Sequence, residues 1–83
     1  MAEEKKPAHE VILDLLQESN DSVSQSGQNP MIKGYVHGLT ATLCRMIIPE
    51  NAKEGIITKL RQMKALFNEA AVDRMIELMN EGK

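Results

Sequence analysis

Aromatic side chains are almost absent from this sequence of 83 residues. Tyr35 and Phe67 are the only two, and tryptophan does not occur. A chain this short buries a comparatively small share of its unfolded surface, and here aliphatic and methionine side chains must fill the core. Small domains with such cores often gain stability by oligomerisation. We therefore expect a homo-oligomer, most simply a homodimer.

Cysteine is nearly absent too, because Cys44 stands alone and has no partner for a disulfide within the chain. Small secreted domains usually rely on several disulfides, which makes a reducing compartment the better expectation. Residues 1–6 are polar or charged apart from Met1 and Ala2, and no apolar run of the signal-peptide type follows them. No stretch approaches the roughly 18 apolar residues of a transmembrane helix. We expect a cytoplasmic protein that does not enter a membrane.

The residues that usually carry out catalysis are sparse and scattered. His37 and Cys44 share a face of one expected helix, but they stand about 10.5 Å apart along its axis, too far for a thiolate–imidazole pair. His9 and His37 also lack the close spacing of a zinc site. Glu10 and Asp14 are typical of a solvated helix surface, and no glycine-rich phosphate loop occurs. We expect no catalytic residues, no cofactor, no metal, and a protein that is not an enzyme.

What the sequence does contain is helical periodicity, without a strand pattern. It predicts an all-α fold, a compact bundle of about four short helices. We expect a flexible N-terminus at 1–6 and a single helical domain over 7–83. The Ser- and Asn-rich stretch at about 19–29 favours local side-chain bonds over a helix, which predicts a polar linker there.

The first helix is expected to begin at Pro7, a residue that suits the first helical position. Its expected buried face consists of Ala8, Val11, Ile12, Leu15 and Leu16. Leu13 falls outside this face, and we expect it to be partly exposed.

The segment 30–48 predicts the central helix of the bundle. Asn29 is a suitable N-cap, Pro30 suits the first helical position, and Pro49 should end the helix near Ile48. At about 100° per residue, one face of this helix is apolar. That face comprises Ile32, Tyr35, Val36, Leu39, Leu43, Met46 and Ile47.

A second face of the same helix is lined by small residues. It comprises Gly34, Gly38, Ala41 and Thr42, with Arg45 at its edge. Each glycine costs about 1 kcal/mol relative to alanine inside a helix, so we expect a second backbone to come close here. Two alternatives remain open. The face meets another subunit of a dimer, or it packs against the first or last helix of its own chain.

The third helix begins at Pro49 or Asn51. Its apolar stripe consists of Ala52, Ile56, Leu60, Met63 and Phe67. Asn68 is a suitable N-cap for a last helix that ends at Gly82. This helix should bury Val72, Met75, Ile76 and Met79. Because the pattern breaks only briefly at Asn68, one bent helix is an alternative to two separate helices.

Charge is unevenly distributed along a chain whose net charge is −2. The segments 1–29 and 67–83 are acidic, whereas 30–66 carries a net charge of +4. The basic middle segment either neutralises its acidic neighbours or faces an acidic partner. On the third helix, one flank carries Lys53, Ile57, Arg61 and Lys64. We interpret this flank as a candidate partner-binding patch, with a plain solvated surface as the alternative.

Together these patterns favour a small non-enzymatic adaptor or regulator that forms a homodimer and binds an unidentified protein partner. The alternative is a small DNA-binding regulator that resembles a helix-turn-helix protein and reads DNA with its basic third helix. DNA readers are usually strongly basic, whereas this chain is acidic overall. Nucleic acid is therefore the less favoured partner.

Overall fold

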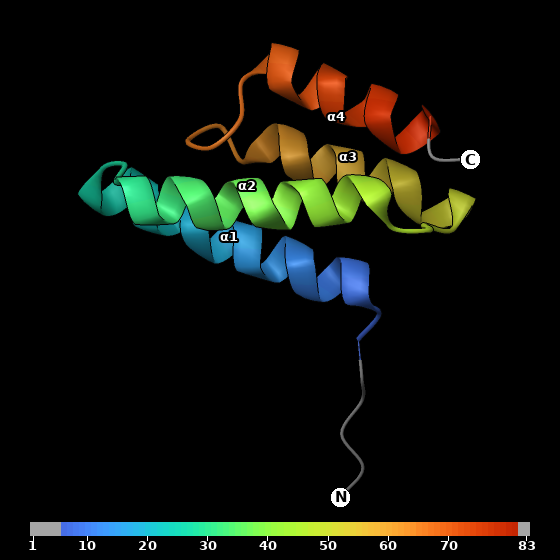
Figure 1. Cartoon of the computed structure of the whole chain (residues 1–83), viewed down its shortest axis with the longest axis horizontal. Coiled ribbons are helices and arrows are strands. Elements are labelled where there is room, and N and C mark those ends of the chain that lie inside the picture. Colours follow the sequence, from blue (N-terminus) through green and yellow to red (C-terminus); the bar gives the residue numbers. More distant parts are fainter. Residues whose placement is uncertain (1–5, 82–83) are drawn as a thin grey trace, which may run out of the picture.

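The computed structural model describes residues 6–81, and this part of the chain contains four α-helices and no strand (Figure 1). The helices are α1 (Ala8–Ser26), α2 (Pro30–Arg45), α3 (Glu50–Gln62) and α4 (Glu69–Glu81). The prediction of an all-α bundle of about four short helices is confirmed. The expected flexible N-terminus lies mostly outside the described residues, which begin at Lys6.

The helix α2 lies between α1 and α4 and packs against both, and α3 packs against α4 (Figure 1). In Figure 1, α2 and α4 run in the same direction, and α1 and α3 run in the opposite direction. The core between them is aliphatic and methionine-rich, as the composition predicts. Its buried apolar side chains are Leu13, Leu16, Val36, Leu43, Cys44, Ile56, Leu60, Met63, Phe67, Val72, Met75 and Met79.

The polar linker expected at 19–29 is wrong over most of its length, because α1 continues to Ser26. One polar side chain of this stretch holds the helix in place. The Oδ1 atom of Asn20 accepts a hydrogen bond of 3.0 Å from the backbone N–H of Ala65, in the connection between α3 and α4. Tertiary contacts of this kind override weak helix propensity. The connection between α1 and α2 is therefore only 27–29.

Gly27 ends α1 with a backbone conformation that other residues rarely adopt. Its φ angle is 83°, and its N–H donates to the carbonyl of Val23 at 2.9 Å. A glycine after the last helical turn takes up such a positive φ without steric cost. The chain can thus reverse direction within a few residues and enter α2.

The buried face of α1 is rotated from the predicted one. Leu13 was expected to be partly exposed but is only 4% exposed, whereas Val11 was expected in the core and is 44% exposed. The stripe that turns inward recurs every three or four residues along the whole helix. It consists of His9, Leu13, Leu16, Asn20 and Val23, all buried or half-buried, and Ser19 beside it is buried as well. Because His9 and Asn20 are polar, apolar periodicity in the sequence does not indicate this stripe.

At the start of α1, the side chain of Lys6 reaches along the helix to Asp14. The Lys6 Nζ atom donates to the Asp14 carboxylate at 2.8 Å. This hydrogen bond lowers the pKa of Asp14 and raises the pKa of Lys6. Both side chains are about half exposed, so the pair contributes little to stability.

The expected start of α2 is confirmed, and its end comes earlier than predicted. The Asn29 Oδ1 atom accepts a hydrogen bond of 2.9 Å from the N–H of Ile32, with Pro30 in the first position. The helix ends at Arg45 rather than near Ile48, because the following residues are extended. Met46 and Ile48 are partly buried and pack against the core, whereas Ile47 is 96% exposed. Such alternation is typical of an extended chain.

The helices α3 and α4 are separate, which settles the alternative of one bent helix. A turn follows α3, and the Asn68 Oδ1 atom caps α4 by accepting from the N–H of Ala71 at 2.7 Å. The expected stripe is largely confirmed, since Ile56, Leu60, Met63 and Phe67 are buried and Ala52 is half-buried. Of the residues expected to be buried on α4, Val72, Met75 and Met79 are buried and Ile76 is half-buried.

Candidate interaction surfaces

The outward side of α2 is an unpartnered surface that we name the open face. It consists of Met31, Gly34, Tyr35, Gly38 and Thr42, all exposed. Met31 is 85% and Tyr35 is 49% exposed, so two large apolar side chains lie there in water. Tyr35 was expected on the buried face, but the core-facing side of α2 is centred on Val36 and Leu43.

Open space lies over the two glycines of the open face, where a side chain would be. A Cβ atom built on Gly34 or on Gly38 would meet no atom within 4 Å beyond the local helix. The alternative that this face packs against the first or last helix of the same chain is therefore wrong, because α1 and α4 lie against other sides of α2. The alternative that it meets a second subunit stays a prediction.

The remaining small-face residues are divided between two environments. Thr42 stays on the open face, where its hydroxyl donates to the carbonyl of Gly38 at 2.9 Å. Ala41 and Arg45 instead line a cavity of about 390 Å³ at the C-terminal ends of α2 and α4. Cys44, Leu78 and Glu81 also line it. The five residues predicted as one face thus form two neighbouring surfaces.

The basic flank predicted on α3 is only partly a continuous patch. The Lys53 side chain is 12% exposed, and its Nζ atom lies 3.3 Å from the Glu50 carboxylate. Ile57 is half-buried and packs on the core. Lys64 lies beyond the end of α3, in the turn that follows it. Free positive charge along α3 is therefore lower than predicted, and the arrangement gives the DNA-binding alternative no added support.

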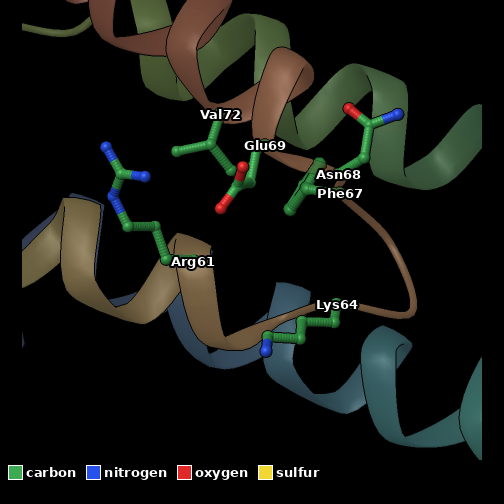
Figure 2. A pocket seen from close by; sticks show the side chains of 6 residues that line it. All are labelled: Arg61, Lys64, Phe67, Asn68, Glu69 and Val72. Carbon is green, nitrogen blue, oxygen red and sulfur yellow. The ribbon is translucent and has the colours of Figure 1, made fainter.

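Arg61 and Lys64 are nevertheless brought together in a pocket between α3 and α4 (Figure 2). Its volume is about 480 Å³, and it is lined by Arg61, Lys64, Phe67, Asn68, Glu69 and Val72. In Figure 2, Arg61 on α3 extends toward Glu69 and Val72 on α4. The Arg61 guanidinium also lies 3.7 Å from the Asp73 carboxylate. The pocket combines apolar side chains with basic groups, which suits a protein partner better than bare phosphates.

A third concave surface, which sequence reasoning missed, lies between α2 and α4. We name it the α2–α4 groove, and its volume is about 350 Å³. Its apolar lining includes Ile32, Val36, Phe67, Ala71, Met75 and Leu78. Lys33, His37 and Arg74 also line it. Lys33 and His37 lie one turn apart on α2. The groove, however, depends on which faces of α2 and α4 meet, and these helices are far apart in the sequence. The sequence alone does not reveal that pairing.

Cys44 and His37, which share a helix, lie in different environments. Cys44 is buried, and its Sγ atom lies 3.9 Å from the carbonyl oxygen of Met75, while His37 is exposed on the groove. Burial raises the pKa of the Cys44 thiol, which disfavours the nucleophilic thiolate. Among residues 6–81, no group of three or more His, Cys, Asp or Glu side chains is placed to hold a metal ion.

The same part of the chain contains no helix that is both long enough and apolar enough to cross a bilayer. Comparisons with known proteins found no matching family model, no matching curated protein and no matching solved structure.

Proposed function

We propose that this protein is a small non-enzymatic adaptor or regulator that acts as a cytoplasmic homodimer and binds a protein partner. The observation that carries the proposal is the open face of α2, where Met31 and Tyr35 are exposed beside two glycines. Exposed apolar side chains that lie together on one face are typical of an interaction site. The same face on a second copy is a self-complementary partner, as two-fold symmetry requires.

The cost of the two glycines supports a contact outside the chain. Two glycines inside α2 cost up to about 2 kcal/mol of helix stability relative to alanine. Neither Gly34 nor Gly38 has a positive φ, and neither is needed for packing within the chain. A second backbone lying close across the open face would fill the space that the glycines leave and would also cover Met31 and Tyr35.

The pocket beside Arg61 and Lys64 supports the second half of the proposal, the binding of a protein partner. Its lining combines the basic Arg61 and Lys64 with Phe67 and Val72, and it lies between α3 and α4, whereas the open face belongs to α2. One protein can therefore form a dimer through one surface and hold a partner at another. That arrangement is what an adaptor requires.

Sedimentation equilibrium of Gly38→Leu tests the dimer, because the leucine has open space within its own chain. We expect the wild type to dimerise with a dissociation constant on the order of 10 to 100 μM and the variant to dissociate at least about tenfold more readily. Gly55→Leu is the matched control, since Gly55 is also a helical, exposed glycine without nearby atoms, but on α3. Circular dichroism should show that both variants remain helical.

Two results would contradict the dimer. One is a wild type that stays monomeric over the whole concentration range. The other is equal dissociation of the Gly38→Leu and Gly55→Leu proteins, which would mean that the open face is not the contact.

A further inference from the structure

We propose that the α2–α4 groove binds an acidic amphipathic helix of a protein partner. The inference rests on the proposed function and deepens it, because it gives the chemical class of the partner and places that partner in the groove instead of the pocket beside Arg61 and Lys64. Helices that lay an apolar face into a hydrophobic groove are a recurring mode of recognition. The groove supplies the apolar floor for such a helix, and its charge indicates which kind of helix fits.

The lining of the groove is positively charged although the chain as a whole is acidic. Lys33 lies on the α2 side and Arg74 on the α4 side, and no Asp or Glu lines the groove. Lys33 forms no ion pair with another residue of the described part of the chain. The Arg74 guanidinium lies 3.3 Å from Glu77, outside the groove, in an exposed pair. Such pairs are weak, so Arg74 can turn to a second carboxylate.

The length of the groove matches the apolar repeat of a short helix. From Ile32 to Thr40, both of which line it, α2 rises by about 12 Å. An amphipathic helix with apolar residues at i, i+3, i+4 and i+7 presents a stripe about 10.5 Å long. Two helical turns of a partner therefore fill the floor, with acidic side chains on either flank reaching Lys33 and Arg74.

A second copy of this chain is a poorer occupant than another protein. Its most acidic helix is α1, which carries Glu10, Asp14, Glu18 and Asp21. The apolar side chains of α1 already face the core of their own chain, with Leu13 and Leu16 buried. Val11 is the one large apolar side chain on α1 that is exposed, so α1 offers no complete apolar stripe to a neighbouring molecule.

Fluorescence anisotropy of the full chain with synthetic labelled peptides tests the proposal. The probe has about 16 residues, enough for a marginal helix in water, with leucines at i, i+3, i+4 and i+7 and glutamates on both flanks. A second peptide replaces every glutamate by lysine, and a third keeps the composition but scrambles the apolar positions. We expect the first peptide to bind at least about tenfold more tightly than either of the others.

Variants of the protein locate the binding site. Lys33→Glu combined with Arg74→Gln should weaken the acidic probe by about tenfold or more. Lys59→Glu makes an exposed lysine of α3 acidic outside both the groove and the pocket between α3 and α4, and it should leave binding unchanged. Lys64→Glu, inside that pocket, distinguishes the two candidate sites. The affinity of the wild type should also fall as salt is raised, because the flanking contacts are charge pairs.

Each alternative outcome overturns the proposal. Equal binding of the lysine peptide or of the scrambled peptide would show that charge or amphipathicity is irrelevant. Loss of binding in Lys64→Glu but not in the double variant would move the partner to the other pocket and leave the proposed function intact. Loss of self-association in the double variant, measured by sedimentation, would assign the groove to a second copy. Failure of the dimer itself is read separately, from the Gly38→Leu experiment.

Discussion

Cys44 shows how position changes the chemistry of a single side chain. Its thiol is buried between α2 and α4, and burial raises its pKa, an effect that the neighbouring charge of Arg45 opposes only in part. The cysteine therefore belongs to the core, where burial disfavours the thiolate that acts as a nucleophile. We expect alkylation by iodoacetamide to be slow in the folded protein and to become fast once urea unfolds it.

The raised pKa of Cys44 also predicts a loss of stability at alkaline pH. Above the ordinary thiol pKa of about 8.5, the unfolded chain releases the proton while the folded chain keeps it. The free energy of unfolding should therefore be unaffected by this group below that pH and should fall as the pH rises through the folded-state pKa. Urea titrations at pH 7 and pH 10 measure the decrease.

The variant Cys44→Ala is the control for this prediction, since lysine and tyrosine side chains also titrate at high pH. The variant starts from a lower stability, because it leaves a small cavity, but its decrease between the two pH values should be smaller than in the wild type. Equal decreases in both proteins would show that the thiol titrates alike in the folded and unfolded states.

At the level of the helices, α2 contains two glycines that no packing within the chain explains. Its N-terminus is well capped by Asn29, but Gly34 and Gly38 weaken its middle without any contact in return. Gly27, directly before it, is different because its φ is 83°. Gly27 is therefore explained by its backbone conformation, whereas Gly34 and Gly38 are explained by the open surface that they leave on α2.

Alanine substitutions at these positions should have opposite effects on stability. Measured on the monomer in dilute solution, Gly34→Ala and Gly38→Ala should each raise the free energy of unfolding by up to about 1 kcal/mol, because alanine is the better helix former. Gly27→Ala should lower it, since alanine is strained at a positive φ. Urea denaturation followed by circular dichroism measures all three, and destabilisation by Gly38→Ala would reveal a contact within the chain.

For the molecule as a whole, the class of fold and the starts of α2 and α4 follow from local patterns. Asn29 and Asn68 cap their helices as predicted, because an N-cap depends on a few adjacent residues. The extent of α1 was not predictable in this way. Asn20 reads locally as a linker residue, yet its partner is the backbone of Ala65, far along the chain.

The candidate surfaces were predictable only in part, for the same reason. Periodicity placed Gly34 and Gly38 together on one face of α2, and the structure has them on that face. Whether anything covers such a face depends on the directions from which α1 and α4 approach, which is a property of the assembled bundle. The α2–α4 groove depends on that pairing, so the sequence does not reveal that Arg74 and Lys33 line the same groove.

The central claim is that a second copy of the chain covers the open face of α2. A dilution series of amide NMR spectra tests it residue by residue, because dimerisation moves the signals of the residues that become covered. We predict that the amide signals of Gly34, Tyr35 and Gly38 shift between millimolar and low micromolar protein, while the signal of Gly55 on α3 stays in place. Concentration-independent signals for all four amides, or equal shifts at Gly55, would contradict the account.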